Sequence, residues 1–372
     1  MQTKVVKLDP NRPDVAKIKE AAVLVDAGRL VAFPTETVYG IACRVQADSL
    51  NRLGKLKGRS PGKYYTVHIG RKSDVEKYVP VIGLRARKLI KNAWPGPLTI
   101  VFDLDAQNID KQRERLDKVV FEELYKDNSI GFRCPDNAIA SILLQQTHSA
   151  VVAPSANITG RIPAADADQV LAQLAGQIEL LLDAGPCKYK KSSTVVKVGK
   201  KGLEILRPGV YSKAHLETIS QVKFLFVCTG NTCRSPMAAA IFRKYLAEKL
   251  QCEVDHLDEM GYKISSAGVM DMVGSPASAE AAAVCAAKGI DIKAHKSRTL
   301  SQQLVENNDF IFAMGRMHCE RVVALSPDAA NKCVLLAEDD IPDPMGHPQQ
   351  VYDRCAELIE EAVKKRIGEL VI

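Results

Sequence analysis

The chain has 372 residues, of which 46% are hydrophobic and 26% are charged, and its formal net charge is +7. This hydrophobic content is ample for packed cores, and no apolar run is long enough to span a membrane. Its ten cysteines lack the spacing of a disulfide framework, and the first twenty residues lack the apolar segment of a signal peptide. We therefore expect a cytoplasmic protein with reduced thiols, and the length allows two or three domains.

The first part of the chain predicts a mixed α/β fold. Apolar runs predict strands at 4–8, 30–33, 64–69, 98–104, 130–133, 150–153, 194–198 and 203–206. Apolar residues at helical spacing predict helices at 13–27, around Leu50, Leu53 and Leu56, and at 166–182, and a charged amphipathic stretch predicts an exposed helix at 111–126.

Several of these strands begin or end at polar side chains. These side chains are Thr35, Arg133, Ser155, Asn157, Ser193 and Arg207. Taken singly, each is more often an ordinary loop residue. Brought together with the cations Lys57, Arg59 and Lys63, they would form a cationic floor with hydroxyl and amide donors, which suits a triphosphate. The glycine-rich loops of the common nucleotide-binding folds do not occur in the sequence.

These residues belong to motifs that occur in the order of a known family. The motifs are 33–40 (FPTETVYG), Lys57-x-Arg59 with Lys63, 94–99 (WPGPLT), 154–157 (PSAN), 193–195 (STV) and 207–209 (RPG). Over residues 3–212 the chain resembles the YrdC-like L-threonylcarbamoyladenylate synthases. The resemblance implies a YrdC-like twisted sheet of mixed α/β type. It also implies synthesis of L-threonylcarbamoyl-AMP from L-threonine, bicarbonate and ATP, with release of pyrophosphate, for tRNA threonylcarbamoyladenosine modification.

The resemblance also implies roles for individual residues. ATP or its phosphates would be contacted by Lys57, Arg59, Lys63, Ser155, Asn157 and Arg207. Threonine or its carbamate would be held by Thr35, His68, Arg133 and Ser193. Mg²⁺ would arrive on the phosphates of ATP, and we expect no metal site made by the protein alone. The chain departs from the family pattern at Ala42, 63–65 and Lys197, changes that bear on ATP binding more than on the fold.

Charge and composition predict a boundary near the middle of the chain. Residues 1–213 hold 34 Lys and Arg against 22 Asp and Glu, a net charge of +12, and the remainder carries −5. A basic excess suits nucleotides or RNA, although it is as often a solvated face. The polar stretch that follows 207–209 predicts domains at 1–212 and 222–372, joined by a linker at 213–221.

The second domain begins with a phosphate loop. Residues 228–235 read CTGNTCRS, between an apolar run at 222–227 and a helix-forming stretch at 237–250. Backbone N–H groups in such a loop bind a tetrahedral oxyanion at the helix N-terminus. The same dipoles should lower the pKa of the Cys228 thiol and make it a nucleophile, and Arg234 offers a planar fork for two phosphate oxygens. The alternative, a buried structural thiol, does not explain the whole motif.

A thiol phosphatase also needs an acid that protonates the leaving group. The candidate is Asp343 in the stiff loop 341–346 (IPDPMG), with Asp339 and Asp340 as competitors. The two motifs together resemble the low-molecular-weight protein tyrosine phosphatases over residues 222–372, which implies a Rossmann-like (flavodoxin-like) parallel sheet and no tightly bound cofactor. The implied roles are Cys228 as nucleophile, Arg234 as phosphate clamp, Asp343 as general acid, and Asn231 and Ser235 as supports of the loop and the thiolate.

Three residues bear on the substrate and regulation of this phosphatase. Tyrosine-specific members usually carry an aliphatic residue at the position of Thr232 and often an aromatic residue at that of Met345. A small polar residue at the Thr232 position resembles the branch that acts on phosphoarginine, so both substrates stay open. Cys233 suggests a disulfide with Cys228 that would protect the nucleophile from over-oxidation.

Together these interpretations predict a bifunctional enzyme. Its partners would be L-threonine, bicarbonate, ATP, tRNA or the tRNA-modification machinery, and a phosphorylated protein, and no membrane is expected. One alternative is that the N-terminal half is a non-catalytic RNA- or nucleotide-binding module attached to an active phosphatase. A second is that the phosphatase half only senses phosphate or redox state.

Overall fold

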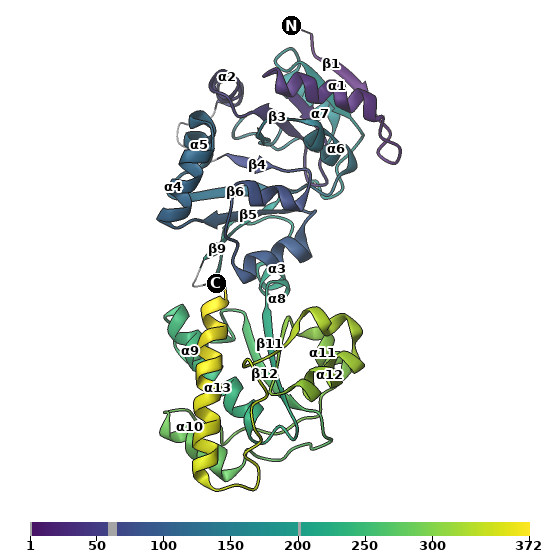
Figure 1. Ribbon diagram of the computed structural model, residues 1–372. Helices are drawn as coiled ribbons and strands as arrows, with labels where there is room; N and C mark the ends of the chain where they lie inside the picture. The colour runs from purple at the N-terminus through teal and green to yellow at the C-terminus, as the bar shows by residue number, and fades with distance from the viewer. Residues whose placement is uncertain (1, 59–64, 200–201) are drawn as a thin grey trace. The chain divides into compact units, whose positions relative to one another are not determined.

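The structure is a computed structural model that describes residues 2–58, 65–199 and 202–372 (Figure 1). The chain divides into two compact units, 1–220 and 221–372. The stretch 213–221, for which we expect a linker, holds helix α8 (Lys213–Ile219), which contacts α3 (Leu84–Ala93) within the first unit. Across the described parts of the chain, no helix has both the length and the apolar character needed to cross a bilayer.

The first unit is built on a mixed sheet, which in the described residues has ten strands. In order across the sheet they are β1 (Lys4–Lys7), β8 (Leu180–Asp183), β2 (Val31–Phe33), β3 (Gly40–Arg44), β7 (Val151–Val152), β4 (Thr66–His68), β6 (Ser129–Arg133), β5 (Leu98–Asp103), β9 (Thr194–Gly199) and β10 (Gly202–Arg207). Some neighbours are parallel, such as β4 with β6, and others are antiparallel, such as β5 with β6. This arrangement confirms the predicted mixed α/β class.

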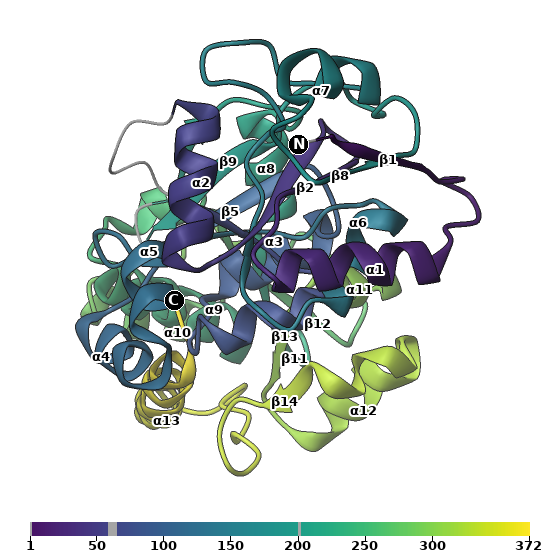
Figure 2. The same cartoon turned by 90° about the horizontal axis from the view of Figure 1, so that it is seen from above.

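Helices pack so that a core forms on each side of this sheet. Helices α1 (Val15–Asp26) and α6 (Ala138–Gln146) lie side by side (Figure 2). Val31 and Phe33 of β2 belong to the core under these two helices, whereas Leu30 and Ala32 belong to the other core, as the alternation of a strand requires. The further helices of this unit are α2 (Ala47–Lys57), the 3-10 helix η1 (Lys72–Lys77), α4 (Ala106–Arg115), α5 (Lys118–Leu124) and α7 (Ala167–Leu174).

Two of the predicted helices are wrong in extent. The helix predicted at 166–182 ends at Leu174, and its last residues belong to β8, which lies between β1 and β2. A short buried apolar run such as 180–182 fits a strand as well as a helix, so periodicity does not separate the two. The helix predicted at 111–126 is split into α4 and α5 because the Asp117 side chain accepts from the backbone N–H groups of Val119 and Val120 and caps α5.

The second unit is a parallel sheet with helices on both faces. Its described strands, in sheet order, are β12 (Tyr262–Gly268), β11 (Val222–Cys228), β13 (Phe310–Ala313) and β14 (Cys333–Leu335). Helices α9 (Arg234–Leu250), α10 (Ala279–Ala287) and α13 (Gln349–Glu369) pack together on one face, and α11 (Gln302–Asn307) and α12 (Arg316–Leu325) lie on the other (Figure 1). The 3-10 helices are η2 (Val254–Leu257) and η3 (Pro327–Asn331). The predicted flavodoxin-like parallel sheet is confirmed.

Candidate active sites

The phosphate loop lies at the carboxyl end of β11, between that strand and α9. The neighbours of β11 are β12 on one side and β13 on the other, and open parallel sheets bind ligands at such a switch point. Gly268 at the end of β12 leaves room for the loop, because a Cβ there would lie 2.7 Å from the carbonyl oxygen of Thr229. Asn231 takes a left-handed backbone conformation with φ 57°, which asparagine tolerates better than most residues.

A hydrogen-bond network holds this loop from behind. Nδ2 of Asn231 donates to Oγ of Ser235 (2.9 Å) and to Oγ of Ser266 (2.8 Å). Oγ of Ser235 lies 2.9 Å from Sγ of Cys228. Oδ1 of Asn231 accepts from the backbone N–H of Arg298 (3.0 Å). Asn231 and Ser235 therefore lie behind the loop, and Ser235 contacts Cys228 directly.

The three predicted catalytic residues of the second unit, Cys228, Arg234 and Asp343, line one pocket of about 180 Å³. Nη1 of Arg234 donates to the carbonyl oxygen of Ile341 (3.0 Å), Nη2 donates to Oγ1 of Thr229 (3.0 Å), and Arg234 forms an ion pair with Asp343. The competing carboxylates Asp339 and Asp340 are not among the lining residues. Nε of Arg234 is buried and has no hydrogen-bond partner among the described residues, whereas Nη2 is shared between Thr229 and Asp343. A phosphoryl group that binds through Nη2 as well as Nε would compete with the Asp343 carboxylate.

The environment of Cys228 differs from the sequence expectation. Burial raises the pKa of the Cys228 thiol above its ordinary value. The Ser235 hydroxyl, backbone N–H groups of Ser235 and Asn231, and the charge of Arg234 act in the opposite direction but do not outweigh it. The expected lowered pKa is thus wrong for this arrangement, because Cys228 is only 2% exposed and desolvation disfavours the thiolate.

Methionines and one threonine complete the lining of this pocket. Met270 and Met345 are about half exposed, at 53% and 51%, and Sδ of Met272 would lie 3.2 Å from a Cβ added at Gly230. The Thr232 side chain also lines the pocket, and its hydroxyl lies 3.6 Å from Sγ of Cys233. Both Cys228 and Cys233 are free thiols, so the suggested disulfide is not formed here.

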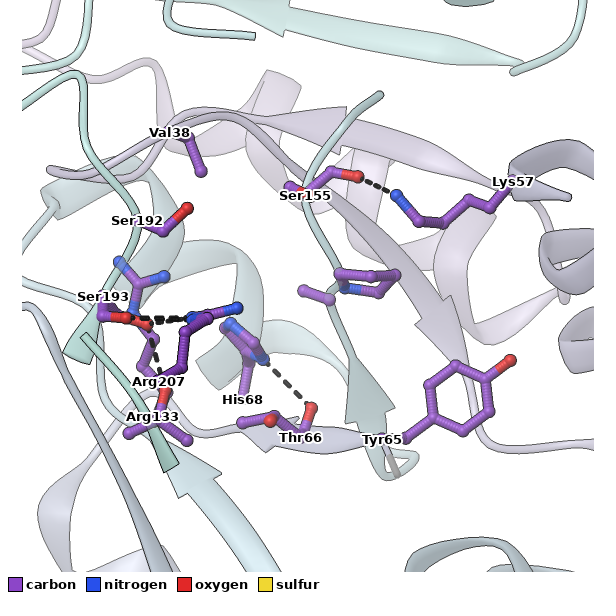
Figure 3. A pocket seen from close by; sticks show the side chains of 13 residues that line it. Val38, Lys57, Tyr65, Thr66, His68, Arg133, Ser155, Ser192, Ser193 and Arg207 are labelled. Atoms are coloured by element: carbon purple, nitrogen blue, oxygen red, sulfur yellow. Dashed lines mark hydrogen bonds between the residues drawn. The ribbon is translucent and has the colours of Figure 1, made fainter. Parts of the chain in front are cut away.

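In the first unit, adjacent strands bring functional side chains to the same edge of the sheet. His68 at the end of β4 pairs in register with Arg133 at the end of β6, and Arg133 pairs with Thr99 on β5. Ser193 directly precedes β9, which is parallel to β5, and Arg207 ends β10. All five side chains line one cavity of about 200 Å³ (Figure 3).

Two arginines give this cavity its positive charge. Arg133 is buried and forms an ion pair with buried Glu36 at 3.1 Å, and its Nη2 also donates to the hydroxyls of Thr35 and Thr37. Arg207 donates from Nη2 to the carbonyl oxygen (2.9 Å) and the hydroxyl (3.0 Å) of Ser193 (Figure 3). Arg207 as a whole residue is exposed, but partial desolvation of its guanidinium and the neighbouring charge of Arg133 lower the pKa of Arg207. With one carboxylate against two guanidinium groups, the cavity favours an anionic ligand.

Lys57 anchors the opposite wall of the cavity. Its Nζ donates to the carbonyl oxygens of Ser155 (2.5 Å) and Asn157 (2.7 Å), as Figure 3 shows for Ser155. Asn157 does not line the cavity, and its Nδ2 donates to the carbonyl oxygens of Ile158 and Arg161. The loop after β7 is therefore held in place by a buried cation, and its Ser155 side faces the cavity.

His68 is a neutral group in this cationic setting. Its ring is buried, and Nδ1 lies 3.1 Å from the carbonyl oxygen of Thr66 (Figure 3). Burial, together with the positive charges of Arg133 and Arg207, lowers the pKa of His68 to about 3, although the Thr66 carbonyl opposes the shift. His68 can therefore exchange hydrogen bonds with a ligand at neutral pH without carrying a charge.

The predicted residues of the first unit fall into three groups. Those that line the cavity are Lys57, His68, Arg133, Ser155, Ser193 and Arg207. Thr35 and Asn157 lie just behind this lining and contact its members. Arg59 and Lys63 lie outside the described residues. Among the residues that the structure describes, no group of three or more His, Cys, Asp or Glu side chains could hold a metal ion.

Sequence reasoning missed several side chains at both sites. Glu36 contacts Arg133 and lies within the motif 33–40, so the motif itself carried the signal. Thr229 likewise lies within the phosphate loop. His318, whose Nε2 lies 3.0 Å from Oγ1 of Thr229, comes from α12 and stands in no recognisable motif.

Two family models match the chain, one in each unit. A model for Sua5, YciO and YrdC proteins, described as telomere recombination, matches residues 23–209. A model described as low molecular weight phosphotyrosine protein phosphatase matches residues 223–371. The chain belongs to both families.

Individual relatives in these families carry three different activities. The threonylcarbamoyl-AMP synthase of Bacillus subtilis (strain 168) is 30% identical over 214 residues, which are 57% of this chain and 58% of that protein. The low molecular weight protein-tyrosine-phosphatase Etp of Escherichia coli (strain K12) is 35% identical, covering 39% of this chain and 93% of Etp. The protein-arginine-phosphatase of Geobacillus stearothermophilus is 34% identical, covering 40% of this chain and 95% of that protein. The chain thus spans little more than half of the synthase but nearly all of both phosphatases.

Proposed function

We propose that the second unit is a protein phosphatase that acts through a cysteinyl-phosphate intermediate. The observation that carries this proposal is the convergence of Cys228, Arg234 and Asp343 on one pocket at the carboxyl end of a parallel sheet. Sγ of Cys228 would attack phosphorus while Arg234 binds two phosphoryl oxygens, and the bond to the leaving oxygen or nitrogen breaks. Asp343 would give that atom a proton and then take one from the water that hydrolyses the intermediate.

The burial of Cys228 sets a condition on this mechanism. The thiolate is stabilised by Ser235, by the loop N–H groups and by Arg234, but desolvation outweighs them. Release of Asp343 from Arg234 by the incoming phosphoryl group would also place the carboxyl beside the leaving atom. Binding of the substrate would thus free Arg234 to bind the phosphoryl oxygens and free Asp343 to act as the general acid.

Two substrate classes fit the pocket, phosphotyrosine and phosphoarginine. The polar side chain of Thr232 and the methionine rim, in place of an aliphatic and an aromatic residue, favour phosphoarginine. Methionine sulfur can also contact an aromatic ring favourably, which keeps phosphotyrosine as the second candidate. Side-by-side kinetics on peptides carrying each phosphoresidue decide between them. Replacement of Cys228 by Ser should abolish hydrolysis of both and of an aryl phosphate, whereas residual turnover would exclude the covalent route and leave a sensing role.

We further propose that the first unit synthesises L-threonylcarbamoyl-AMP. Arg133, Arg207 and His68 converge on one positively charged cavity, which suits the carboxylate of threonine and the phosphates of ATP. The amino nitrogen of threonine would form a bond to the carbon of bicarbonate, with loss of water, to give a carbamate. The carbamate oxygen would then attack the α-phosphorus of ATP with loss of pyrophosphate. Catalysis would consist mainly of positioning and charge neutralisation, without a covalent enzyme intermediate.

Lys57 would act in this reaction by fixing Ser155 and the Asn157 backbone at the cavity wall. Mg²⁺ would be held by the phosphates of ATP. The product would feed the modification of tRNA, which gives the chain tRNA or the tRNA-modification machinery as partners and places it in the cytoplasm.

The test of this proposal is pyrophosphate release from ATP that requires both L-threonine and bicarbonate. Arg133→Ala should abolish it. If release is absent from the wild-type chain but RNA or nucleotide binding is intact, the first unit is a non-catalytic binding module, the alternative that its basic charge also permits.

A further inference from the structure

His318 contacts the phosphate loop through the side chain of Thr229. It lies in the first turn of α12, is 2% exposed, and places Nε2 3.0 Å from Oγ1 of Thr229. The same oxygen of Thr229 lies 3.0 Å from Nη2 of Arg234, the group that would clamp the phosphoryl oxygens. One hydroxyl therefore joins the imidazole to the guanidinium.

The direction of these two hydrogen bonds follows from their chemistry. A guanidinium group only donates, so Oγ1 of Thr229 must accept from Arg234. Nε2 of His318 is the acceptor that the described residues offer to the Thr229 hydroxyl proton, so we assign this bond as Thr229 donating to Nε2. This assigns the ring proton to Nδ1, an assignment made from the partners.

The surroundings of His318 keep its ring neutral. Burial and the charge of Arg234 lower the pKa of His318 below its ordinary value, while the carboxylates of Asp340 and Asp343 and the carbonyl of Gly315 oppose the shift. The first turn of a helix also disfavours a cation. Nδ1 is buried and has no hydrogen-bond partner in the part of the chain that the structure describes.

We propose that His318 is a positioning residue of the phosphatase reaction, and this proposal rests on the phosphatase function proposed above. As a neutral acceptor it orients the Thr229 hydroxyl so that the oxygen faces Arg234 and holds the guanidinium toward the pocket. When a phosphoryl group takes the place of Asp343, Arg234 would keep its hydrogen bond to Oγ1 of Thr229.

Protonation of His318 removes the acceptor that orients the Thr229 hydroxyl. A doubly protonated ring offers only a donor at Nε2, so the Thr229 proton loses this partner and the hydroxyl is no longer held in one orientation toward Arg234. Because the pKa of His318 is lowered, this change falls below about pH 6.5, the ordinary value for histidine.

Two substitutions of His318 separate positioning from packing. His318→Gln keeps a side-chain acceptor near the position of Nε2 but does not titrate, whereas His318→Phe keeps a ring without an acceptor. We expect His318→Phe to lower kcat/KM for an aryl phosphate about five- to tenfold, the effect of one hydrogen bond, and His318→Gln to restore most of the loss. Thr229→Val should match His318→Phe, and the double variant should be no worse than either single variant.

The pH dependence of kcat/KM distinguishes positioning from packing, because a loss of packing at His318 would not change it. The ratio of His318→Gln to wild-type kcat/KM should be constant above about pH 6.5 and rise below it. A ratio that is flat across this range, or equal losses in the Gln and Phe variants, would overturn the proposal. If His318→Phe does not fold, Thr229→Val and Thr229→Ser can be compared instead, because the first removes the hydroxyl and the second keeps it.

A second readout does not depend on turnover. Inorganic phosphate should protect Cys228 in the full chain from alkylation, measured at that residue by peptide mass spectrometry. The phosphate concentration for half protection should rise about five- to tenfold in His318→Phe and little in His318→Gln. If His318→Phe needs the same phosphate concentration for half protection of Cys228 as the wild type, His318 does not position Arg234. Failure of the phosphatase function itself appears separately, as turnover that survives in Cys228→Ser.

Discussion

Replacement of His68 by Asn should change how the stability of the first unit depends on pH. Burial and the charges of Arg133 and Arg207 lower the pKa of His68 to about 3 in the folded protein. The unfolded chain binds a proton at the ordinary histidine pKa of about 6.5. Between these two values the unfolded state binds a proton that the folded state does not. The contribution of neutral His68 to stability is therefore complete above about pH 6.5 and is lost as the pH falls toward 3.

The size of this effect follows from the pKa shift. Each pH unit well inside the window costs about 1.4 kcal/mol, so the wild type loses roughly 2 kcal/mol through His68 alone between pH 6.5 and 4.5. The variant asparagine does not titrate, and its side-chain N–H can reach the Thr66 carbonyl that Nδ1 of His68 now contacts. Other titrating groups contribute to both proteins and cancel in the comparison.

The single tryptophan of the chain makes the measurement specific to the first unit. Trp94 is 2% exposed and its Nε1 donates to the carbonyl oxygen of Leu98 (2.8 Å), so its fluorescence reports unfolding of that unit. Urea denaturation at about pH 7 and pH 4.5 gives the free energy of unfolding for each protein. The variant should be less stable at pH 7, and its deficit should shrink by about 2 to 3 kcal/mol at pH 4.5. If both proteins lose stability in parallel, His68 is charged in the folded state and this reasoning is wrong.

Three further substitutions test individual roles. Asp343→Asn should lower kcat for a phosphotyrosine peptide about 10²- to 10⁴-fold but affect p-nitrophenyl phosphate less, since its leaving group needs no proton; equal losses would show that Asp343 is not the acid. Arg133→Lys keeps the charge but not the planar fork, so KM for L-threonine in pyrophosphate release should rise about ten- to hundredfold with little change for ATP; parallel rises would refute a specific contact with threonine. Thr232→Ile should shift the ratio of kcat/KM values for phosphotyrosine and phosphoarginine peptides about tenfold toward phosphotyrosine, and an unchanged ratio would exclude Thr232 from substrate selection.

The sequence predicts the classes of both folds because its signals are local and mutually consistent. An apolar strand, a phosphate loop and a helix follow each other directly at 222–250, and the structure has β11, the loop and α9 there. By contrast, 166–182 is apolar at helical spacing throughout, and only the pairing of β8 with β1 and β2 makes its end a strand. The spacing of apolar residues within one segment does not reveal which strands that segment pairs with in the folded protein.

The contacts between predicted site residues depend on partners that sequence does not reveal. The pairing of Arg133 with Glu36 depends on two segments almost a hundred residues apart. The raised pKa of Cys228 depends on how deeply the loop is buried, which the motif does not specify. The contact of His318 with Thr229 joins α12 to a loop 89 residues earlier in the chain.

The most direct test of the account is a comparison of two variants in two assays, each on the full chain. Threonine- and bicarbonate-dependent pyrophosphate release and phosphopeptide hydrolysis are measured for wild type, Cys228→Ser and Arg133→Ala. The wild type should perform both reactions, Cys228→Ser should lose only hydrolysis, and Arg133→Ala should lose only pyrophosphate release. A wild-type chain that lacks either activity, or a variant that loses the activity of the other unit, would contradict the assignment of one active site to each unit.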